Sequence, residues 1–235
     1  MLIMAKQALT IVPVLVLGES HCTAISRALR HDIQDQFITI DVRTGADASK
    51  INFNLFSRIA PRTLVLAFGG TEHNIIGLIE AEPKFDFLWP PFDDLDPARC
   101  LIPASAVEQL LHNRMQSALG RAMAVRERFD CPTYAVAPPP PFLTIDEKAL
   151  LPKSFAGLIE AGIAPAPLRR KLYALQCEVM LRAYKRHGIE MIPAPAGATD
   201  EDGYLHRWMW NRDPTHGNRN YGKLVLDHLR NKLDV

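Results

Sequence analysis

The stretch Ile11–Leu17 (IVPVLVL) is a continuous apolar run rich in β-branched residues, and it leads directly into Gly18-Glu19-Ser20. A run of this kind, without polar alternation, is typical of a central strand buried on both faces. Ser20–His31 follows with apolar residues at helical spacing. The chain is therefore expected to pass from strand to helix at Ser20, at the carboxyl edge of a sheet.

Four further apolar runs, separated by helical patterns, predict the rest of the sheet. They are Phe37–Val42 (FITIDV), Thr63–Phe68 (TLVLAF), Thr133–Ala137 (TYAVA) and Ile189–Pro193 (IEMIP). Leu168–His187 and Tyr221–Leu233 have the spacing of helices. Strands that alternate with helices imply right-handed crossovers and a parallel sheet between two helical layers. We therefore predict an α/β protein with a three-layer α/β/α architecture.

The length of 235 residues suits one α/β domain with a well-buried core, so we predict a single domain over residues 1–235. Two stretches, near 80–103 and 143–167, do not fit the alternation of strands and helices. They are expected to be insertions that leave this domain close to its ligand-binding face, because long irregular segments in compact domains commonly carry function.

Charge and cysteine content argue against several classes of partner. Lys plus Arg (27) nearly balances Asp plus Glu (26), so no nucleic-acid or membrane partner is expected. The four cysteines show no CxxC spacing, which predicts neither a zinc site nor a disulfide framework. No apolar stretch approaches the length of about 20 residues that spans a membrane. We expect a soluble, cytoplasmic protein.

The first segment that can carry chemistry is the turn at Ser20. A serine between a strand and a helix places its hydroxyl at the carboxyl end of the sheet, near backbone N–H groups that stabilise negative charge. Serine is also a favoured helix N-cap, so this junction alone needs no catalysis. Cys22 is an alternative nucleophile, but its side chain is expected to turn toward the core.

The second segment is Phe68-Gly69-Gly70-Thr71-Glu72-His73-Asn74, at the end of the third strand. In a doubly wound sheet, ligands bind at the switch point between the first and third strands, so this loop should face Ser20. Asn74 can present an amide donor to an oxyanion, and His73 is a candidate substrate-binding residue. A glycine-rich turn with a capping Asn or Thr is the plainer interpretation.

The third segment is Asp213-Pro214-Thr215-His216, which precedes the last helix. A separation of three residues on a tight turn puts both side chains on the same side. The carboxylate can then orient the imidazole, whose other nitrogen is left to take a proton from a serine. A capping aspartate would give the same pattern without catalysis.

In chain order, these three segments resemble the blocks of the SGNH/GDSL hydrolase superfamily, over residues 12–233. Gly18-Glu19-Ser20 is similar to the family's G-D-S block, with Glu in place of Asp, and Asp213-x-x-His216 matches the last block without change. The resemblance implies a flavodoxin-like sheet of five parallel strands in the order 2-1-3-4-5. It also implies that Gly45 donates a backbone N–H to the oxyanion hole, and an ungapped match places Thr71 at the family's oxyanion asparagine.

The segment before Asp213 contains two tryptophans, Trp208 and Trp210, flanked by arginines. In an extended segment, residues two apart point the same way, so the pair could bind substrate by stacking on a sugar ring or by lining an acyl pocket. Anchoring of the loop onto the core is the alternative.

The leading hypothesis is a serine esterase with the triad Ser20, Asp213 and His216, acting on a small-molecule or carbohydrate ester through an acyl-enzyme. No metal or organic cofactor is implied. The resemblance suggests a short acyl group. A catalytically degenerate SGNH domain that binds a glycan or a partner is the rival hypothesis. A nucleotide-binding flavodoxin-like protein is disfavoured, because the first turn lacks a phosphate-cradling cluster.

Overall fold

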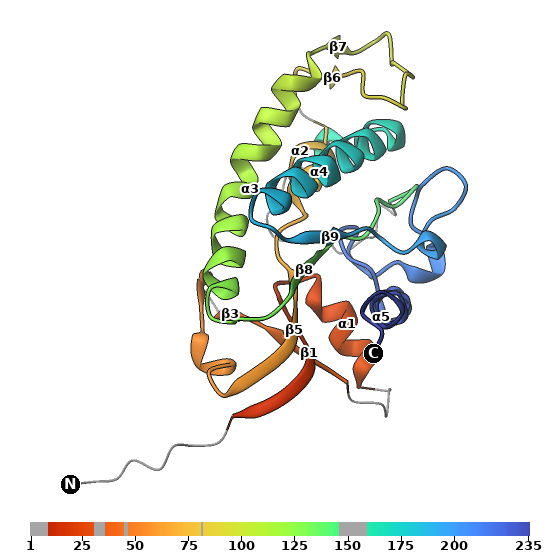
Figure 1. Cartoon of the computed structure of the whole chain (residues 1–235). Coiled ribbons are helices and arrows are strands. Elements are labelled where there is room, and N and C mark those ends of the chain that lie inside the picture. The colour runs from red at the N-terminus through yellow and green to blue at the C-terminus, as the bar shows by residue number, and fades with distance from the viewer. Residues whose placement is uncertain (1–8, 31–35, 45–46, 81, 146–158) are drawn as a thin grey trace, which may run out of the picture.

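A computed structural model describes residues 9–30, 36–44, 47–80, 82–145 and 159–235 (Figure 1). Its centre is a parallel sheet of five strands in the order β2-β1-β5-β8-β9, which confirms the predicted order. The strands are β1 (Thr10–Gly18), β2 (Phe37–Asp41), β5 (Ile59–Ala67), β8 (Thr133–Val136) and β9 (Glu190–Ile192). Every pairing in this sheet is parallel.

The central strand β1 is buried on both faces, as its uninterrupted apolar run predicted. Leu15 and Leu17 belong to one hydrophobic core, whereas Val14 and Val16 belong to the other. All four side chains are fully shielded from solvent. Because successive residues of a strand point to opposite faces, this division shows that helices cover the sheet on both sides.

Helices α1 (Cys22–Leu29) and α5 (Arg219–Leu233) pack together over one face of the sheet. Helices α2 (Glu72–Gly77), α3 (Ala104–Arg126) and α4 (Ala166–Arg186) pack over the other face (Figure 1). Gly222 lets α5 approach α1 closely, because a Cβ at this position would lie 2.0 Å from the carbonyl oxygen of Ala24. The three-layer α/β/α architecture is therefore confirmed.

Several boundaries differ from the sequence-based expectation. The first helix begins at Cys22 rather than Ser20, because Glu19–His21 form a separate turn. β5 begins at Ile59, four residues earlier than predicted, since β1 continues to pair with it there. The 23-residue helix α3 was not predicted. Its buried residues are spaced three or four apart (Val107, Leu111, Met115, Ala118, Ala122 and Val125), but many polar residues separate them.

The remaining elements are short. β3 (Arg43–Thr44) pairs with β4 (Asp47–Ile51), and β6 (Phe85–Asp86) pairs with β7 (Cys100–Leu101) inside the expected 80–103 insertion. Most of the expected 143–167 insertion lies outside the described residues, which resume at η3 (Ile159–Ala161). The described part of the chain also contains the 3-10 helices η1 (Phe53–Leu55), η4 (Ala196–Ala198) and η5 (Arg207–Met209). Among the described residues, no helix is both long and apolar enough to span a membrane.

Candidate active site

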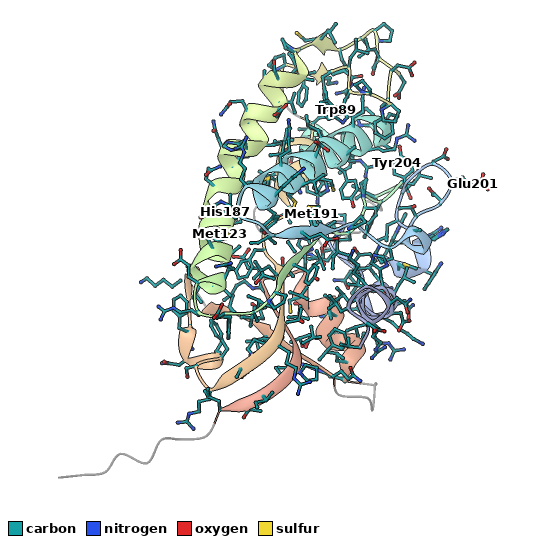
Figure 2. The ribbon with its side chains drawn as sticks, viewed as in Figure 1. Trp89, Met123, His187, Met191, Glu201 and Tyr204 are labelled. Atoms are coloured by element: carbon teal, nitrogen blue, oxygen red, sulfur yellow. The ribbon has the colours of Figure 1, made fainter. Side chains whose placement is uncertain are left out.

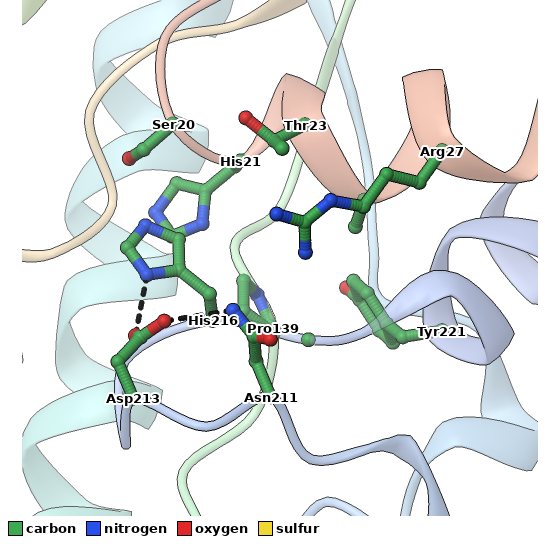
Figure 3. Close-up of a pocket in the computed structure, with 11 residues that line it drawn as sticks. Ser20, His21, Thr23, Arg27, Pro139, Asn211, Asp213, His216 and Tyr221 are labelled. Carbon is green, nitrogen blue, oxygen red and sulfur yellow. Dashed lines mark hydrogen bonds and ion pairs between the residues drawn. The ribbon is translucent and has the colours of Figure 1, made fainter. Parts of the chain in front are cut away.

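Ser20 lies in the turn that joins β1 to α1. This turn is closed by two backbone hydrogen bonds: Cys22 N–H donates to the Glu19 carbonyl over 3.0 Å, and Thr23 N–H donates to the Ser20 carbonyl over 3.1 Å. Ser20 lines a pocket of about 180 Å³ between the start of α1 and the loop that carries His216 (Figure 3). The strand end therefore presents the serine at the carboxyl edge of the sheet, as predicted.

Asp213 and His216 lie on one tight turn, and both line the same pocket as Ser20 (Figure 3). The imidazole Nδ1 is 2.6 Å from Asp213 Oδ1. The other ring nitrogen, Nε2, is buried and has no hydrogen-bond partner in the described part of the chain. A histidine held through Nδ1, with Nε2 free, is oriented to accept a proton from a neighbouring hydroxyl.

Three further hydrogen bonds hold the Asp213 carboxylate. Thr215 donates to Oδ1 from its backbone N–H (3.1 Å) and from its hydroxyl (2.8 Å), and Asn211 Nδ2 donates to Oδ2 over 2.8 Å. Burial acts to raise the pKa of Asp213, but the bonds from His216 and Thr215 outweigh it and lower the pKa to about 2. The carboxylate is therefore ionised at neutral pH and can stabilise a protonated imidazole.

His21, for which no role was predicted, also lines this pocket. Its ring centroid is 5.0 Å from that of His216, and the rings are inclined by 44°. Both of its ring nitrogens are buried without a hydrogen-bond partner among the described residues. Burial, followed by the nearby His216, lowers the pKa of His21 well below 6.5, so the ring is neutral at pH 7. Only its position beside Ser20 could have indicated this placement.

The Gly69-Gly70 loop is tied to the serine turn through Glu19. Gly69 N–H donates to Glu19 Oε2 over 3.4 Å, and Arg121 Nε donates to Glu19 Oε1 over 2.6 Å. Gly70 has a φ of +96°, which favours glycine. Its N–H donates to Glu72 Oε2 over 2.8 Å. Glu19, the residue that departs from the G-D-S pattern, thus connects the turn after β1 to the loop after β5 and to α3.

Two of the predicted oxyanion residues, Thr71 and Asn74, lie next to this loop but do not line the pocket. Thr71 precedes α2, and Asn74 lies within α2, where it is 5% exposed. His73 is 2% exposed, and its Nδ1 lies 3.2 Å from Gln176 Oε1. Gly45 lies outside the described residues. The roles of Asn74, Thr71, Gly45 and His73 therefore stay predictions.

The tryptophan segment is not extended, and that expectation was wrong. Residues Arg207–Met209 form a 3-10 turn, so the alternation expected of an extended segment does not hold here. Trp210 stacks on Phe142, with 4.6 Å between ring centroids, and its Nε1 donates to the Leu205 carbonyl over 2.6 Å. Trp208 is 57% exposed. Neither tryptophan lines the pocket, so contact with substrate stays a prediction for both.

Cys22 is buried, as predicted, and burial raises the pKa of its thiol to about 12. The thiol is therefore protonated at neutral pH and is a poor nucleophile. Within the described part of the chain, no group of three or more His, Cys, Asp or Glu side chains is arranged to hold a metal ion.

Because histidines are buried in this protein, we expect it to lose stability in mild acid. Burial lowers the pKa of His73 from 6.5 to about 4, although the hydrogen bond with Gln176 opposes this shift. The unfolded chain therefore binds this proton first as the pH falls, and stability should decrease below about pH 6.5 until His73 titrates in the folded protein. Each such histidine contributes a slope of ~1.4 kcal/mol per pH unit in this window.

Urea unfolding at pH 7 and pH 5 measures this slope. His73→Gln, which keeps an amide beside Gln176 but cannot titrate, should lose less stability between the two pH values than the wild-type protein, by about 2 kcal/mol. His187→Gln, at an exposed position, is the control and should behave as wild type. Equal losses in all three proteins would contradict the assignment of His73 as a buried neutral histidine.

The solved structures that resemble this chain share few residues with it. A protein from Streptococcus pneumonia, provisionally described as a platelet activating factor, has a TM-score of 0.51 and 12% identity over 97% of this chain and 86% of its own. A GDSL-like lipase from Bacteroides thetaiotaomicron has a TM-score of 0.48 and 10% identity over 94% of this chain and 87% of its own. A carbohydrate acetylesterase from Sinorhizobium meliloti has a TM-score of 0.42 and 14% identity over 95% and 98% of the two chains.

Comparison with protein-family models gives no match, and comparison with curated protein sequences gives none either. At 12% identity, the similarity to the protein from Streptococcus pneumonia concerns the fold alone, which in this chain is a parallel five-stranded sheet between two helical layers.

Proposed function

We propose that this protein is a serine esterase that hydrolyses a short-chain acyl ester through an acyl-enzyme intermediate. The observation that carries the proposal is the shared pocket of Ser20, Asp213 and His216, in which Asp213 holds Nδ1 of the imidazole over 2.6 Å and leaves Nε2 without a partner among the described residues. The esterase and lipase names of proteins with similar folds agree with this proposal.

In the first half-reaction, His216 Nε2 takes the Ser20 hydroxyl proton while the serine oxygen bonds to the acyl carbon. The resulting imidazolium is stabilised by the ionised Asp213. When the tetrahedral intermediate collapses, the bond to the alcohol oxygen breaks and His216 returns the proton to that oxygen. A water molecule then attacks the acyl-enzyme by the same route, which releases the acid and restores Ser20.

The tetrahedral intermediate carries a negative oxygen that needs hydrogen-bond donors. The backbone N–H of Ser20 is one proposed donor, because it lies at the start of the turn and no described residue accepts from it. Asn74 or Thr71, with Gly45, would supply the others. Glu19 supports this arrangement, since it holds Gly69 next to the serine turn.

A screen of short aryl esters and acetylated sugars tests the proposal. We expect hydrolysis of acetyl or similarly short esters, because the resemblance of the three sequence blocks suggests a short acyl group. Ser20→Ala protein, purified in the same way, is the control for contaminating esterases. Absence of turnover across the panel, in protein that is folded by circular dichroism, would favour the alternative of a degenerate domain that binds a glycan or a partner.

A further inference from the structure

One wall of the pocket is a single face of helix α1. Thr23 and Arg27 are one helical turn apart and line the pocket together with Ala24, whose small side chain leaves space between them. Four residues of α-helix span about 6 Å, so Arg27 lies well beyond Ser20 along the pocket. Figure 3 shows its guanidinium directed into the space between α1 and Tyr221.

Among the described residues that line this pocket, Arg27 is the only Lys or Arg, and no described carboxylate forms an ion pair with it. By contrast, Arg43 is paired with Asp41, and Arg121 is paired with Glu19. An arginine that projects into a pocket without a partner carries a fixed positive charge and a planar set of donors that match a carboxylate or phosphate.

The one carboxylate in the pocket does not neutralise this charge. Asp213 directs its oxygens to His216, Thr215 and Asn211, with four hydrogen bonds between 2.6 and 3.1 Å. The other wall consists of neutral residues, including Pro139 and Gly217. Asp41 lines an adjacent cleft with Arg27 but is paired with Arg43. The pocket therefore has its reacting groups at one end and, at the other, a guanidinium that forms no ion pair with a described carboxylate.

From this arrangement we infer that the enzyme selects esters whose non-reacting part carries an anionic group, a carboxylate or a phosphate, which Arg27 binds while Ser20 attacks the acyl carbon. This inference rests on the proposed esterase function. Arg27 acts in substrate selection, and the chemistry stays with Ser20 and His216. Both anions have two or more oxygens that accept hydrogen bonds from a guanidinium.

Matched substrates test the inference. The 4-nitrophenyl half-esters of succinate and glutarate carry a free carboxylate, and their methyl-capped forms have nearly the same length without the charge. We expect wild-type kcat/KM to be higher for the charged member of a pair. In Arg27→Gln the ratio of charged to capped kcat/KM should fall about 10- to 100-fold, the usual effect of losing a charge-assisted hydrogen bond.

Arg30→Gln is the control, because Arg30 lies on the same helix end but does not line the pocket. It should keep the wild-type ratio, and Arg27→Lys should recover part of it. An unchanged ratio in Arg27→Gln, or an equal fall in Arg30→Gln, would overturn the inference. Higher ionic strength should reduce the wild-type ratio, because salt screens the exposed guanidinium.

A binding experiment separates this inference from the proposed function. Succinate and inorganic phosphate are titrated into Ser20→Ala protein and followed by NMR, with Ser20→Ala/Arg27→Gln as the matched control. If either anion binds Ser20→Ala but not Ser20→Ala/Arg27→Gln, the result supports the anionic subsite even if no ester is hydrolysed. The relative affinities identify which anion the subsite prefers. Binding that is unchanged in the control, or no binding at tens of millimolar anion, would overturn it.

Discussion

Ser20→Ala and His216→Ala proteins should each lose esterase activity by about 10⁴-fold or more in kcat/KM, with melting temperatures close to that of the wild-type protein. The serine supplies the bond-forming oxygen and the histidine removes its proton, so neither is useful without the other. The double mutant should therefore be barely worse than either single mutant. Initial rates on the best ester from the screen, with circular dichroism as the check on folding, measure this.

Residual activity needs a matched control, because small traces of another esterase can resemble a weak mutant. Thr215→Val removes one hydroxyl bond to Asp213 but leaves the bond between Asp213 and His216, so its loss should be far smaller. If the fold losses in kcat/KM of the two single mutants multiplied in the double mutant, Ser20 and His216 would act independently. That outcome would contradict a shared proton transfer between them.

Removal of the oxyanion donor should lower kcat by about 10²–10³, with little change in KM, because the donor acts mainly on the transition state. We predict that Asn74 is this donor, so that Asn74→Ala shows the loss and Thr71→Val does not. Asn74 lies on α2, and its backbone N–H donates to the Thr71 carbonyl over 3.0 Å, so the two residues belong to one turn.

The two substitutions discriminate between the two ways of matching this loop to the family. If Thr71→Val lowers kcat strongly while Asn74→Ala hardly changes it, the ungapped match is correct and the choice of Asn74 is wrong. Because Asn74 is buried, Asn74→Asp is a useful second variant: it keeps the shape but removes the N–H donor and places a carboxyl group there. Thermal melting of each variant separates a lost donor from a disturbed α2.

The fold was largely predictable because the strong signals in this sequence are local. β1 lies at the centre of the sheet and is buried on both faces, so its residues form a continuous apolar run. Helix α3 was missed because its buried residues are separated by polar residues that face solvent. The helix could be recognised only in the structure, where it covers one face of the sheet.

The candidate site was predictable where chemistry depends on residues close in sequence. Asp213 and His216 are three residues apart, and their turn brings the two side chains together as expected. Contacts between distant residues were not predictable: the bond from Gly69 to Glu19 and the ion pair of Glu19 with Arg121 join three separate elements. His21 was overlooked because a single histidine has no periodicity, and its burial depends on the loop of His216 packing against it.

Labelling with a serine-directed fluorophosphonate, followed by peptide mass spectrometry, tests the central claim most directly. A phosphonate reacts only with a serine whose hydroxyl is activated by a neighbouring base. We expect one label on the peptide containing Ser20, none in His216→Ala, and protection by a hydrolysable ester. Labelling of another residue, or of Ser20 to the same extent in His216→Ala, would contradict the assignment of Ser20 and His216 as nucleophile and base.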